Sequence, residues 1–310
     1  LNVFCDELVV EKFEDLIKVE KAICKNAGLK NAQEFGANSL YAFESAVLKA
    51  LAVEQGKELW QLINPKARRI PLPVGNVVGG GLHSATKQNK PNFQEFLIIP
   101  KGKNFAKNYE IMQWVYKETG KKLKALLVND EGAWLVSTDD ETVLDALHTI
   151  RLQAEKKFGC DVGLGIDIAS STFYADEQYK YNDKVLNQET HLNYFQTLYC
   201  NYDLDYIEDP LEQHDFKGFA TLHKRIGGLI VGDDLIATQY NRLAGAIRTK
   251  SINAVIIKPN QNGSLPELRR IFELCKKHRI KTVMSHRSGE TLDNALADYA
   301  VGFGADYIKC

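Results

Sequence analysis

A series of short apolar runs, each followed at once by a charged or strongly polar residue, dominates this sequence from residue 125 onward. Apolar runs of this length between turn residues are typical of buried β-strands. Strands buried on both faces are typical of a parallel sheet that is covered by helices. The runs occupy residues 125–128, 162–166, 204–207, 230–232, 254–257, 282–285 and 307–308, and the residues that follow them are Asn129, Asp167, Glu208, Asp233, Lys258, His286 and Lys309.

Helical segments between the runs indicate how the strands are connected. Thr138 and Glu141 form a possible capping box before one segment of helical periodicity, and Ser264 and Glu267 form another. Alternating strands and helices predict parallel strands joined by crossovers. Polar residues at most strand ends favour an α/β fold of the TIM-like (β/α) barrel type, whose active sites lie at those ends. An open doubly wound sheet is the alternative, but its ligands bind at one switch point.

The first 64 residues have a different pattern from the rest of the chain. Apolar residues recur at helical spacing within 10–19 and within 42–51, which predicts a small helical unit. The pair Asn64-Pro65 and the basic residues after it indicate a linker. We therefore expect a helical domain at 1–64 and a barrel domain at 65–310, with further strands at 72–78 and 96–99.

The composition excludes several classes of partner. The 310 residues include 39 Lys and Arg against 40 Asp and Glu, so the formal net charge is -1. This balance gives no bulk attraction to nucleic acid or to an anionic membrane. No apolar run is long enough for a membrane span, and the N-terminal residues do not form a signal peptide. Six cysteines without a C-x-x-C pair indicate free thiols, which predicts a cytoplasmic location.

Asp167, Glu208 and Asp233 follow three successive strand runs. Neighbouring barrel strands would bring these carboxylates together, and such a cluster needs a cation. Oxygen ligands without nearby His or Cys suit Mg²⁺, which keeps open positions for water and substrate. The alternative is that each acid only caps the helix after it, but three acids in succession make that account the weaker one. The sequence therefore predicts Mg²⁺ as the cofactor.

Two lysines follow later strands and should face the same cavity. These are Lys258 and Lys309, and both come directly after buried apolar runs, which disfavours the alternative of ordinary surface lysines. A lysine that is enclosed near cations has a lowered pKa, and its neutral amine can then act as a base. Glu131 and Glu95 are candidates for the opposing acid in an elimination of water.

The segment Val-Met-Ser-His-Arg-Ser-Gly-Glu at 283–290 predicts a site for a small anion. His286, Arg287 and Ser288 offer an imidazole, a guanidinium fork and a hydroxyl to a phosphate or carboxylate. The alternative for these residues alone is a polar turn after a buried strand. The three glycines at 79–81 with His83 are consistent with a mobile lid over such an anion.

Several segments, taken in order, resemble the signatures of the enolase family. The resemblance extends from Gly36 nearly to the last residue and implies the architecture of that family. We therefore expect an α/β fold in which a TIM-like (β/α) barrel of the enolase type is preceded by a small, truncated helical part of an α+β capping domain. The matching segments are 94–96, 129–132, 165–171, 207–210, 231–235, 258–261 and 283–290.

The resemblance also implies a reaction and a set of residue roles. The reaction is the reversible Mg²⁺-dependent dehydration of 2-phospho-D-glycerate to phosphoenolpyruvate, a hydro-lyase step of glycolysis and gluconeogenesis. The family suggests a homodimer, and the ligand is a small molecule. The implied residues are Asp167, Glu208 and Asp233 for the metal, Lys258 as the base, Glu131 with Glu95 as the acid, Lys309 for the substrate carboxylate, Arg287 and Ser288 for the phosphate, and His83, Gln94 and His286 for the rest of the pocket.

Two regions of the family have no counterpart in this sequence. One is the N-terminal β-hairpin region, with the serine-bearing loop that closes over a second Mg²⁺, and the other is the segment after Lys309. We therefore expect an incomplete enolase of low activity. The strand at 307–309 should have an open edge, and Lys309 should be poorly positioned on it.

Two alternative functions remain open at this point. The chain resembles the wider superfamily of acid-sugar dehydratases and cycloisomerases, but the Lys-x-Lys pair usual at an early strand end there is absent. The second alternative is a catalytically silent enolase-like protein that serves as a binding or structural component. The retained acid, base and metal ligands argue against silence, because buried charges are costly to fold around.

Overall fold

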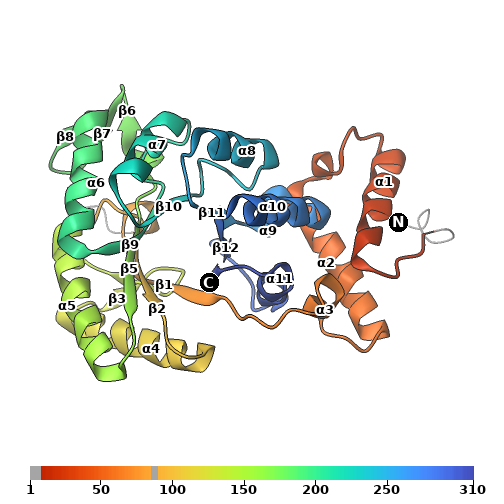
Figure 1. Cartoon of the computed structure of the whole chain (residues 1–310), viewed down its shortest axis with the longest axis horizontal. Helices are drawn as coiled ribbons and strands as arrows, with labels where there is room; N and C mark the ends of the chain where they lie inside the picture. Colours follow the sequence, from red (N-terminus) through yellow and green to blue (C-terminus); the bar gives the residue numbers. More distant parts are fainter. Residues whose placement is uncertain (1–7, 85–89) are drawn as a thin grey trace.

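Eight strands form a closed barrel in the computed structural model, which describes residues 8–84 and 90–310 (Figure 1). The ring closes because the last strand pairs with both its neighbour in sequence and the first strand. In ring order the strands are β1 (Leu72–Gly79), β2 (Glu95–Pro100), β5 (Val162–Asp167), β9 (Leu204–Glu208), β10 (Leu229–Gly232), β11 (Ala254–Ile257), β12 (Lys281–Ser285) and β13 (Tyr307–Lys309). The predicted barrel is thus confirmed.

The expectation of uniformly parallel strands is wrong for β2. This strand pairs antiparallel with β1 on one side and with β5 on the other, whereas the other neighbouring pairs of the ring are parallel. An antiparallel strand begins at the rim where parallel strands end. Glu95, the first residue of β2, therefore pairs in register with Asp167, the last residue of β5.

The apolar run at 125–128 is not a barrel strand. Its residues form β3 (Leu127–Val128), which makes a small hairpin with β4 (Trp134–Leu135) beside β1. Leu126 is 90% exposed, so hydrophobicity did not indicate burial here. Between the two strands, the side chain of Asn129 accepts the backbone N–H groups of Glu131 and Ala133 and fixes the turn.

The predicted open edge at 307–309 is also wrong. Tyr307, Ile308 and Lys309 pair in register with β12 on one side and with β1 on the other. Residues of the inner strand faces fill the barrel in a cluster of their own, which includes Val74 of β1, and the partly buried Tyr307 of β13 packs against it. The cluster consists of Val74, Leu97, Ile99, Tyr206, Val231, Ala254, Ile256 and Val283.

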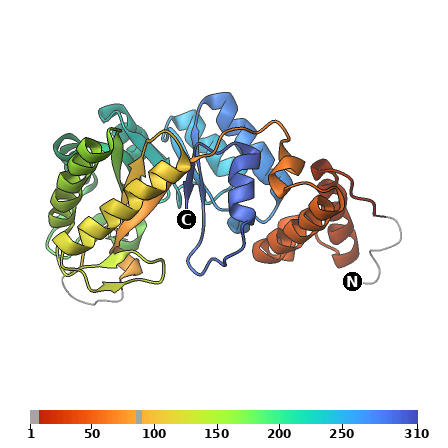
Figure 2. The same ribbon diagram turned by 90° about the horizontal axis from the view of Figure 1, so that it is seen from below.

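Helices surround the barrel and bury their apolar faces against it (Figures 1 and 2). Side-chain caps fix several of their starts: Ser264 accepts the N–H of Glu267 as predicted, whereas the cap at 138–141 is Asp139 rather than Thr138. The helices are α4 (Phe105–Lys122), α5 (Asp140–Phe158), α6 (Gln188–Tyr202), α7 (Phe216–Arg225), α8 (Tyr240–Thr249), the short α9 (Pro259–Asn262), α10 (Leu265–His278) and α11 (Ala295–Phe303), with 3-10 turns η3 (Gly81–His83) and η4 (Ser170–Phe173).

Two smaller units flank the barrel. A three-stranded sheet of β6 (Tyr174–Ala175), β7 (Gln178–Lys180) and β8 (Val185–Leu186) precedes α6. At the other end lie α1 (Leu16–Ala27), α2 (Ala37–Glu54) and α3 (Leu59–Ile63), with 3-10 turns η1 (Phe13–Asp15) and η2 (Ala32–Phe35), next to α10 and α11 (Figure 1).

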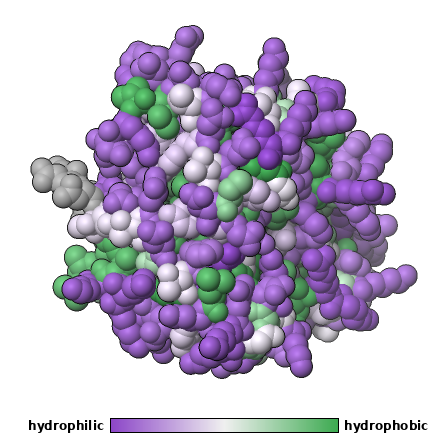
Figure 3. Space-filling model, turned by 60° about the vertical axis from the view of Figure 1, so that its left-hand side comes forward, coloured by the Kyte–Doolittle hydropathy of each residue, from purple (hydrophilic) through white to green (hydrophobic). Residues whose placement is uncertain are grey.

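The N-terminal helical unit shares its core with the barrel helices. The ring of Phe13 meets that of Phe303 of α11 edge to face at 5.8 Å, and a Cβ on Gly302 would lie 2.9 Å from Ile63 of α3. The division into domains at residue 64 stays a prediction. Within the described residues, no helix has the length and apolar content needed to cross a membrane. The face in Figure 3 is mainly hydrophilic, with apolar residues in small separate groups.

Candidate active site

The three predicted metal-binding acids lie on adjacent strands at one rim of the barrel. Asp167 and Glu208 end β5 and β9 and pair in register, and Asp233 follows β10, the next strand of the ring. All three are buried, with exposed fractions of 3%, 0% and 7%. Parallel neighbours that end in register explain how residues 66 positions apart in sequence (233 minus 167) meet at one place.

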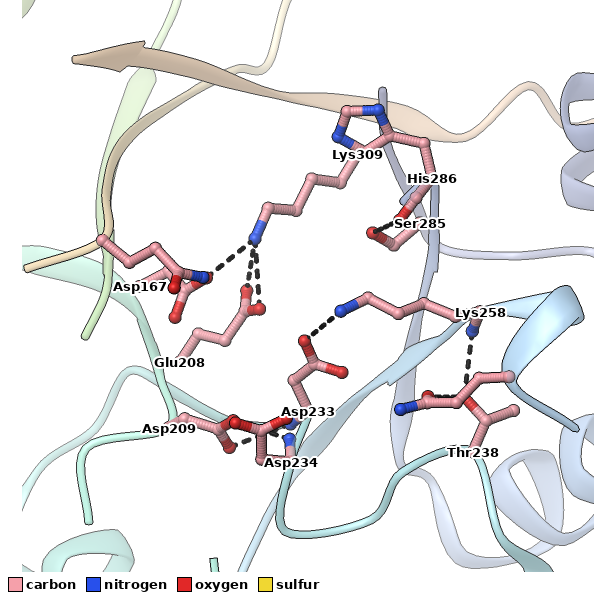
Figure 4. A network of polar contacts seen from close by, with 12 residues as sticks. Asp167, Glu208, Asp209, Asp233, Asp234, Thr238, Lys258, Ser285, His286 and Lys309 are labelled. Carbon is pink, nitrogen blue, oxygen red and sulfur yellow. Dashed lines mark hydrogen bonds and ion pairs between the residues drawn. The ribbon is translucent and has the colours of Figure 1, made fainter. Parts of the chain in front are cut away.

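The ammonium of Lys309 lies among buried carboxyl groups (Figure 4). Its Nζ is 2.7 Å from Glu95 Oε2, 3.1 Å from both oxygens of Glu208 and 3.2 Å from Asp167 Oδ2. Burial opposes the charge on Lys309, but the surrounding acids raise its pKa well above the ordinary value. Burial also raises the pKa of Glu208, to which Tyr206 donates a hydrogen bond of 2.6 Å. One ammonium thus serves three buried carboxyl groups.

Lys258 is paired with Asp233, as Figure 4 also shows. Its backbone N–H donates to the hydroxyl of Thr238 at 3.0 Å, which holds the end of β11 against the loop after β10. Burial lowers the pKa of Lys258, but the charge and hydrogen bond of Asp233 outweigh burial and raise it above the ordinary value. The predicted lowering of this pKa is therefore wrong for the lysine in this pairing.

A second cluster, of His83, Glu95 and Glu131, lies at the same rim. The Nδ1 of His83 is 3.4 Å from Glu131 Oε2 and 3.6 Å from Glu95 Oε1. Although burial alone would raise the pKa of Glu131, His83 and Ser288 lower it to about 2. Burial raises the pKa of Glu95, and the hydrogen bond to Glu131 raises that of His83. These shifts therefore favour a proton on Glu95 and His83 over one on Glu131.

The remaining predicted residues surround the two clusters. Gln94 donates to Asp167 at 3.4 Å, and Ser288 donates to Glu131 at 2.8 Å. His286 has its Nε2 4.0 Å from Glu131 Oε1, and burial lowers its pKa. Arg287 is exposed, and it has no ion pair within the described part of the chain.

A cavity of about 370 Å³ opens beside these clusters. Glu131, His286 and Lys309 line one part of it, and residues of β1 and α4, among them Val77 and Met112, line most of the rest. The close packing of the loop after β1 helps to shape this rim, because a Cβ on Gly80 would lie 2.4 Å from the carbonyl oxygen of Phe93. The lid predicted from the glycines at 79–81 and His83 stays a prediction; in this structure Gly79 ends β1, and Gly81–His83 form the 3-10 turn η3.

Comparison with known proteins decides the family. The family model "Enolase, C-terminal TIM barrel domain" matches residues 67–310. The chain belongs to the enolase family. An enolase of Archaeoglobus fulgidus is 36% identical over 301 residues, which cover 95% of this chain and 75% of that protein. Enolases of Natronomonas pharaonis and Ehrlichia canis are 35% and 34% identical, over 98% and 94% of this chain and 79% and 71% of their own lengths.

The acids of this enolase-family chain are a suitable donor set for a hard divalent cation. Three buried carboxylates converge, and Oδ1 of Asp233 is buried without a hydrogen-bond partner in the described structure. Within the described residues, two groups have possible ligand atoms that all lie within 4.8 Å of one another, and the set of Asp167, Glu208 and Asp233 is not one of them. The two groups are His83 with Glu95 and Glu131, and Asp209 with Asp233 and Asp234. Lys309 lies between Asp167 and Glu208, and Lys258 holds Asp233, so the two ammonium groups supply the positive charge in this structure.

Sequence reasoning missed a set of residues that hold this enolase-family rim together. Asp209 is buried and accepts backbone N–H groups of Asp233 and Asp234, while Thr238 binds the backbone of Lys258. The signal was the doubling of acids at the ends of β9 and β10, where only the first acid of each pair was assigned. An acid with a second acid beside it at a strand end is a candidate support for its neighbour.

Proposed function

We propose that this enolase-family chain catalyses the reversible Mg²⁺-dependent dehydration of 2-phospho-D-glycerate to phosphoenolpyruvate. The observation that carries the proposal is the position of the Lys258 amine at the same rim as the cluster of His83, Glu95 and Glu131, with buried acids between them. A base and a proton-carrying cluster at one rim are what an elimination of water requires. The names of the relatives support the same reaction class.

Asp167, Glu208 and Asp233 would hold the Mg²⁺. When bound, the ion supplies the positive charge that stabilises the dianion formed as a proton leaves the carbon beside a carboxylate. Their burial supports this assignment, because three carboxylates with little solvent gain more from a cation than exposed ones would. Lys309 lies against two of them and is suited to bind the substrate carboxylate.

Lys258 would take the proton from C2 of the substrate. Its amine is a base only after the ammonium has lost a proton, and the ion pair with Asp233 opposes that loss. A cation or solvent that binds the Asp233 carboxylate would weaken its ion pair with Lys258, and Lys258 would then lose its proton more easily. The electron pair of the C2–H bond first stays on the substrate, in the dianion of its carboxylate, and it forms the C2–C3 double bond when the bond from C3 to its hydroxyl breaks.

The departing hydroxyl needs a proton to leave as water. The surroundings lower the pKa of Glu131 and raise the pKa values of Glu95 and His83, and Nδ1 of His83 lies 3.4 Å from Glu131 and 3.6 Å from Glu95. We therefore assign delivery of the proton to Glu131 with Glu95 and His83 as its source. Ser288 and His286 lie beside Glu131, Arg287 lies between them on the loop after β12, and the three would bind the phosphate.

A direct absorbance assay for phosphoenolpyruvate tests the proposal. The chain is given 2-phospho-D-glycerate with Mg²⁺, with chelator and without either. Formation of phosphoenolpyruvate only with Mg²⁺ supports the proposal, and product formation from an acid sugar instead would favour the wider superfamily. No turnover of either substrate at any Mg²⁺ concentration would favour a silent binding protein. The homodimer and the cytoplasmic location stay predictions.

A further inference from the structure

Asp209 adopts an unusual backbone conformation at the end of β9. Its φ is 42°, in the left-handed region that residues other than glycine rarely adopt, and its side chain is only 4% exposed. Conformations of this kind persist where surrounding contacts hold them. Three kinds of contact do so here, and each leads to one of the strands that carry the proposed metal ligands.

The carboxylate of Asp209 holds the loop after β10. Its Oδ1 accepts the N–H of Asp233 at 2.9 Å, and its Oδ2 accepts the N–H of Asp234 at 2.6 Å (Figure 4). Both oxygens are thus occupied by two successive backbone donors. An ionised acceptor makes such bonds stronger than a neutral one would.

The backbone of Asp209 joins the neighbouring strands. Its N–H donates to the carbonyl of Val231 in β10 at 3.0 Å, and its carbonyl accepts the N–H of Ser170 at 3.2 Å. Ser170 lies three residues beyond Asp167, in the turn that follows β5. One residue therefore ties together the chain segments that carry Asp167, Glu208 and Asp233.

The same loop continues to the proposed base. The carbonyl of Asp233 accepts the N–H groups of Ile236 and Ala237, which folds the loop back, and Thr238 then accepts the N–H of Lys258. A shift of the loop at Asp233 would thus displace both Asp233 and Lys258, the two partners of the ion pair.

We propose that Asp209 is a positioning residue for the metal site, which holds the Asp233 backbone so that the Asp233 carboxylate faces Glu208 and Lys258. This inference rests on the proposed function, because it assumes that Asp233 binds the metal. Asp209 itself is not assigned as a ligand, since both of its oxygens already accept backbone N–H groups.

The test compares Asp209→Asn with a matched variant, Asp15→Asn. Asp15 is also buried, at 5% exposure, and its carboxylate also accepts two successive backbone N–H groups, those of Glu11 and Lys12, but it lies in the helical unit away from the rim. Both of these bonds go to Oδ2 of Asp15, while its Oδ1 pairs with Lys18 at 2.7 Å. At Asp209, where each oxygen accepts one N–H, the amide of Asn can accept only one of the two bonds and turns an N–H₂ group toward the other donor. Asp209→Ser is a second variant, in which water can replace the lost oxygens.

Binding of Mn²⁺ alone is measured by electron paramagnetic resonance, together with hydrogen exchange at residues 233–238. We expect Asp209→Asn and Asp209→Ser to weaken Mn²⁺ binding by about tenfold or more, as removal of a ligand's support does, and to speed exchange in the loop. Asp15→Asn should lower the melting temperature but leave Mn²⁺ affinity within about twofold of the wild type, since it touches no part of the site.

Two results would overturn the inference, and they are distinguishable. If the wild-type chain binds Mn²⁺ and the folded Asp209 variants bind it equally well, Asp209 does not position the site, while the proposed function stands. If the wild-type chain binds no Mn²⁺, the proposed metal dependence fails and the inference fails with it.

Discussion

The ammonium of Lys309 lies 2.7 Å from Oε2 of Glu95, and the strands that carry these residues, β13 and β2, flank the same strand, β1. Lys309 pairs in register with Val74 of β1, and Glu95 pairs with Gly79 of β1. The contact therefore spans the place where the ring closes. It also joins the acids of β5 and β9 to the cluster around Glu131, so that the two halves of the site share one buried cation.

Replacement of Lys309 by Met should destabilise the fold strongly. Glu95, Asp167 and Glu208 would lose their shared ammonium, and removing one partner of a buried ion pair costs about 3–5 kcal/mol. Urea unfolding measures the change. The control is Lys101→Met, since the pair of Lys101 with Asp205 is exposed to solvent and should contribute less than about 1 kcal/mol. Equal losses for the two variants would show that burial of the Lys309 cluster has no energetic importance.

Lys258→Ala and Glu131→Gln should separate the two halves of the reaction. Without the amine, exchange of the C2 proton with solvent deuterium should stop, because no other group is assigned to take that proton. With Glu131→Gln, some exchange should persist while dehydration stops. Proton magnetic resonance of 2-phospho-D-glycerate in deuterium oxide follows the exchange. The reverse pattern would mean that the two roles are exchanged.

Asp233→Asn should raise the Mg²⁺ concentration needed for half-maximal activity by about tenfold or more, because a neutral amide is a weaker ligand than a carboxylate. The neighbouring Asp234→Asn is the matched control. It changes the same charge one residue away and should alter this concentration much less. A larger effect at Asp234 would move the ligand assignment to that residue.

Glu44→Gln should stabilise the protein in alkaline solution. Glu44 of α2 is fully buried, and burial raises its pKa to about 9 from an ordinary 4.5, although it accepts the N–H of Leu265 at 2.7 Å. The folded chain keeps this proton and the unfolded chain releases it above pH 4.5, so stability falls as pH rises from about 4.5 to 9. At pH 8 the variant should be more stable by a few kcal/mol, on the order of the linkage energy. Identical melting temperatures of the two proteins at pH 8 would contradict this account.

His191→Phe should make stability less sensitive to acid. His191 stacks on Tyr179 at 3.6 Å and hydrogen-bonds the carbonyl of Pro210 at 2.8 Å, and burial lowers its pKa to about 3 from 6.5. Below pH 6.5 the unfolded chain binds a proton at His191, whereas the folded chain does not bind it until the pH is near 3. The stability that His191 contributes above pH 6.5 is therefore lost as the pH falls toward 3.

At pH 7 the free energy of unfolding of His191→Phe should be about 1 kcal/mol lower than that of the wild type, because the hydrogen bond to Pro210 is lost. On acidification from pH 7 to pH 5, however, the free energy of unfolding of the variant should fall by about 2 kcal/mol less than that of the wild type. Urea unfolding at both pH values measures this difference. The exposed His214→Gln should follow the wild-type pH dependence. If His191→Phe does so as well, another group is responsible for the acid sensitivity.

The pattern of polar residues at strand ends predicted which side chains lie at the rim, because this pattern can be recognised within short segments of sequence. Asp167, Glu208 and Asp233 each follow a buried run directly, and a parallel barrel brings such ends together whatever the loops do. The direction of β2 could not be predicted in this way, since an apolar run has the same pattern in either direction. The exposed run at 125–128 shows a related weakness, because hydrophobicity alone does not tell which strands have a neighbour to cover them.

The electrostatics of the site were less predictable than its location. The pKa of Lys258 depends on Asp233, which comes from another strand and forms its ion pair only in the folded chain. Asp209 was not assigned because only the first acid of each strand-end pair was taken as functional. The doubled acids indicate a supporting residue, but its hydrogen bonds to the backbone of Asp233 and Asp234 depend on the conformation of a loop from another strand.

The pairing of β1 with β13 joins Leu72 to Tyr307, which are 235 residues apart (307 minus 72). Contacts of such long range form slowly, because much chain entropy is lost before they are made. The antiparallel pairing of β1 with β2, by contrast, joins Gly79 to Glu95 across a short connection. In refolding, helices and the β1–β2 pair should therefore return first, and Lys309 should reach its acids only in the last and slowest phase, so that metal binding recovers after most of the secondary structure.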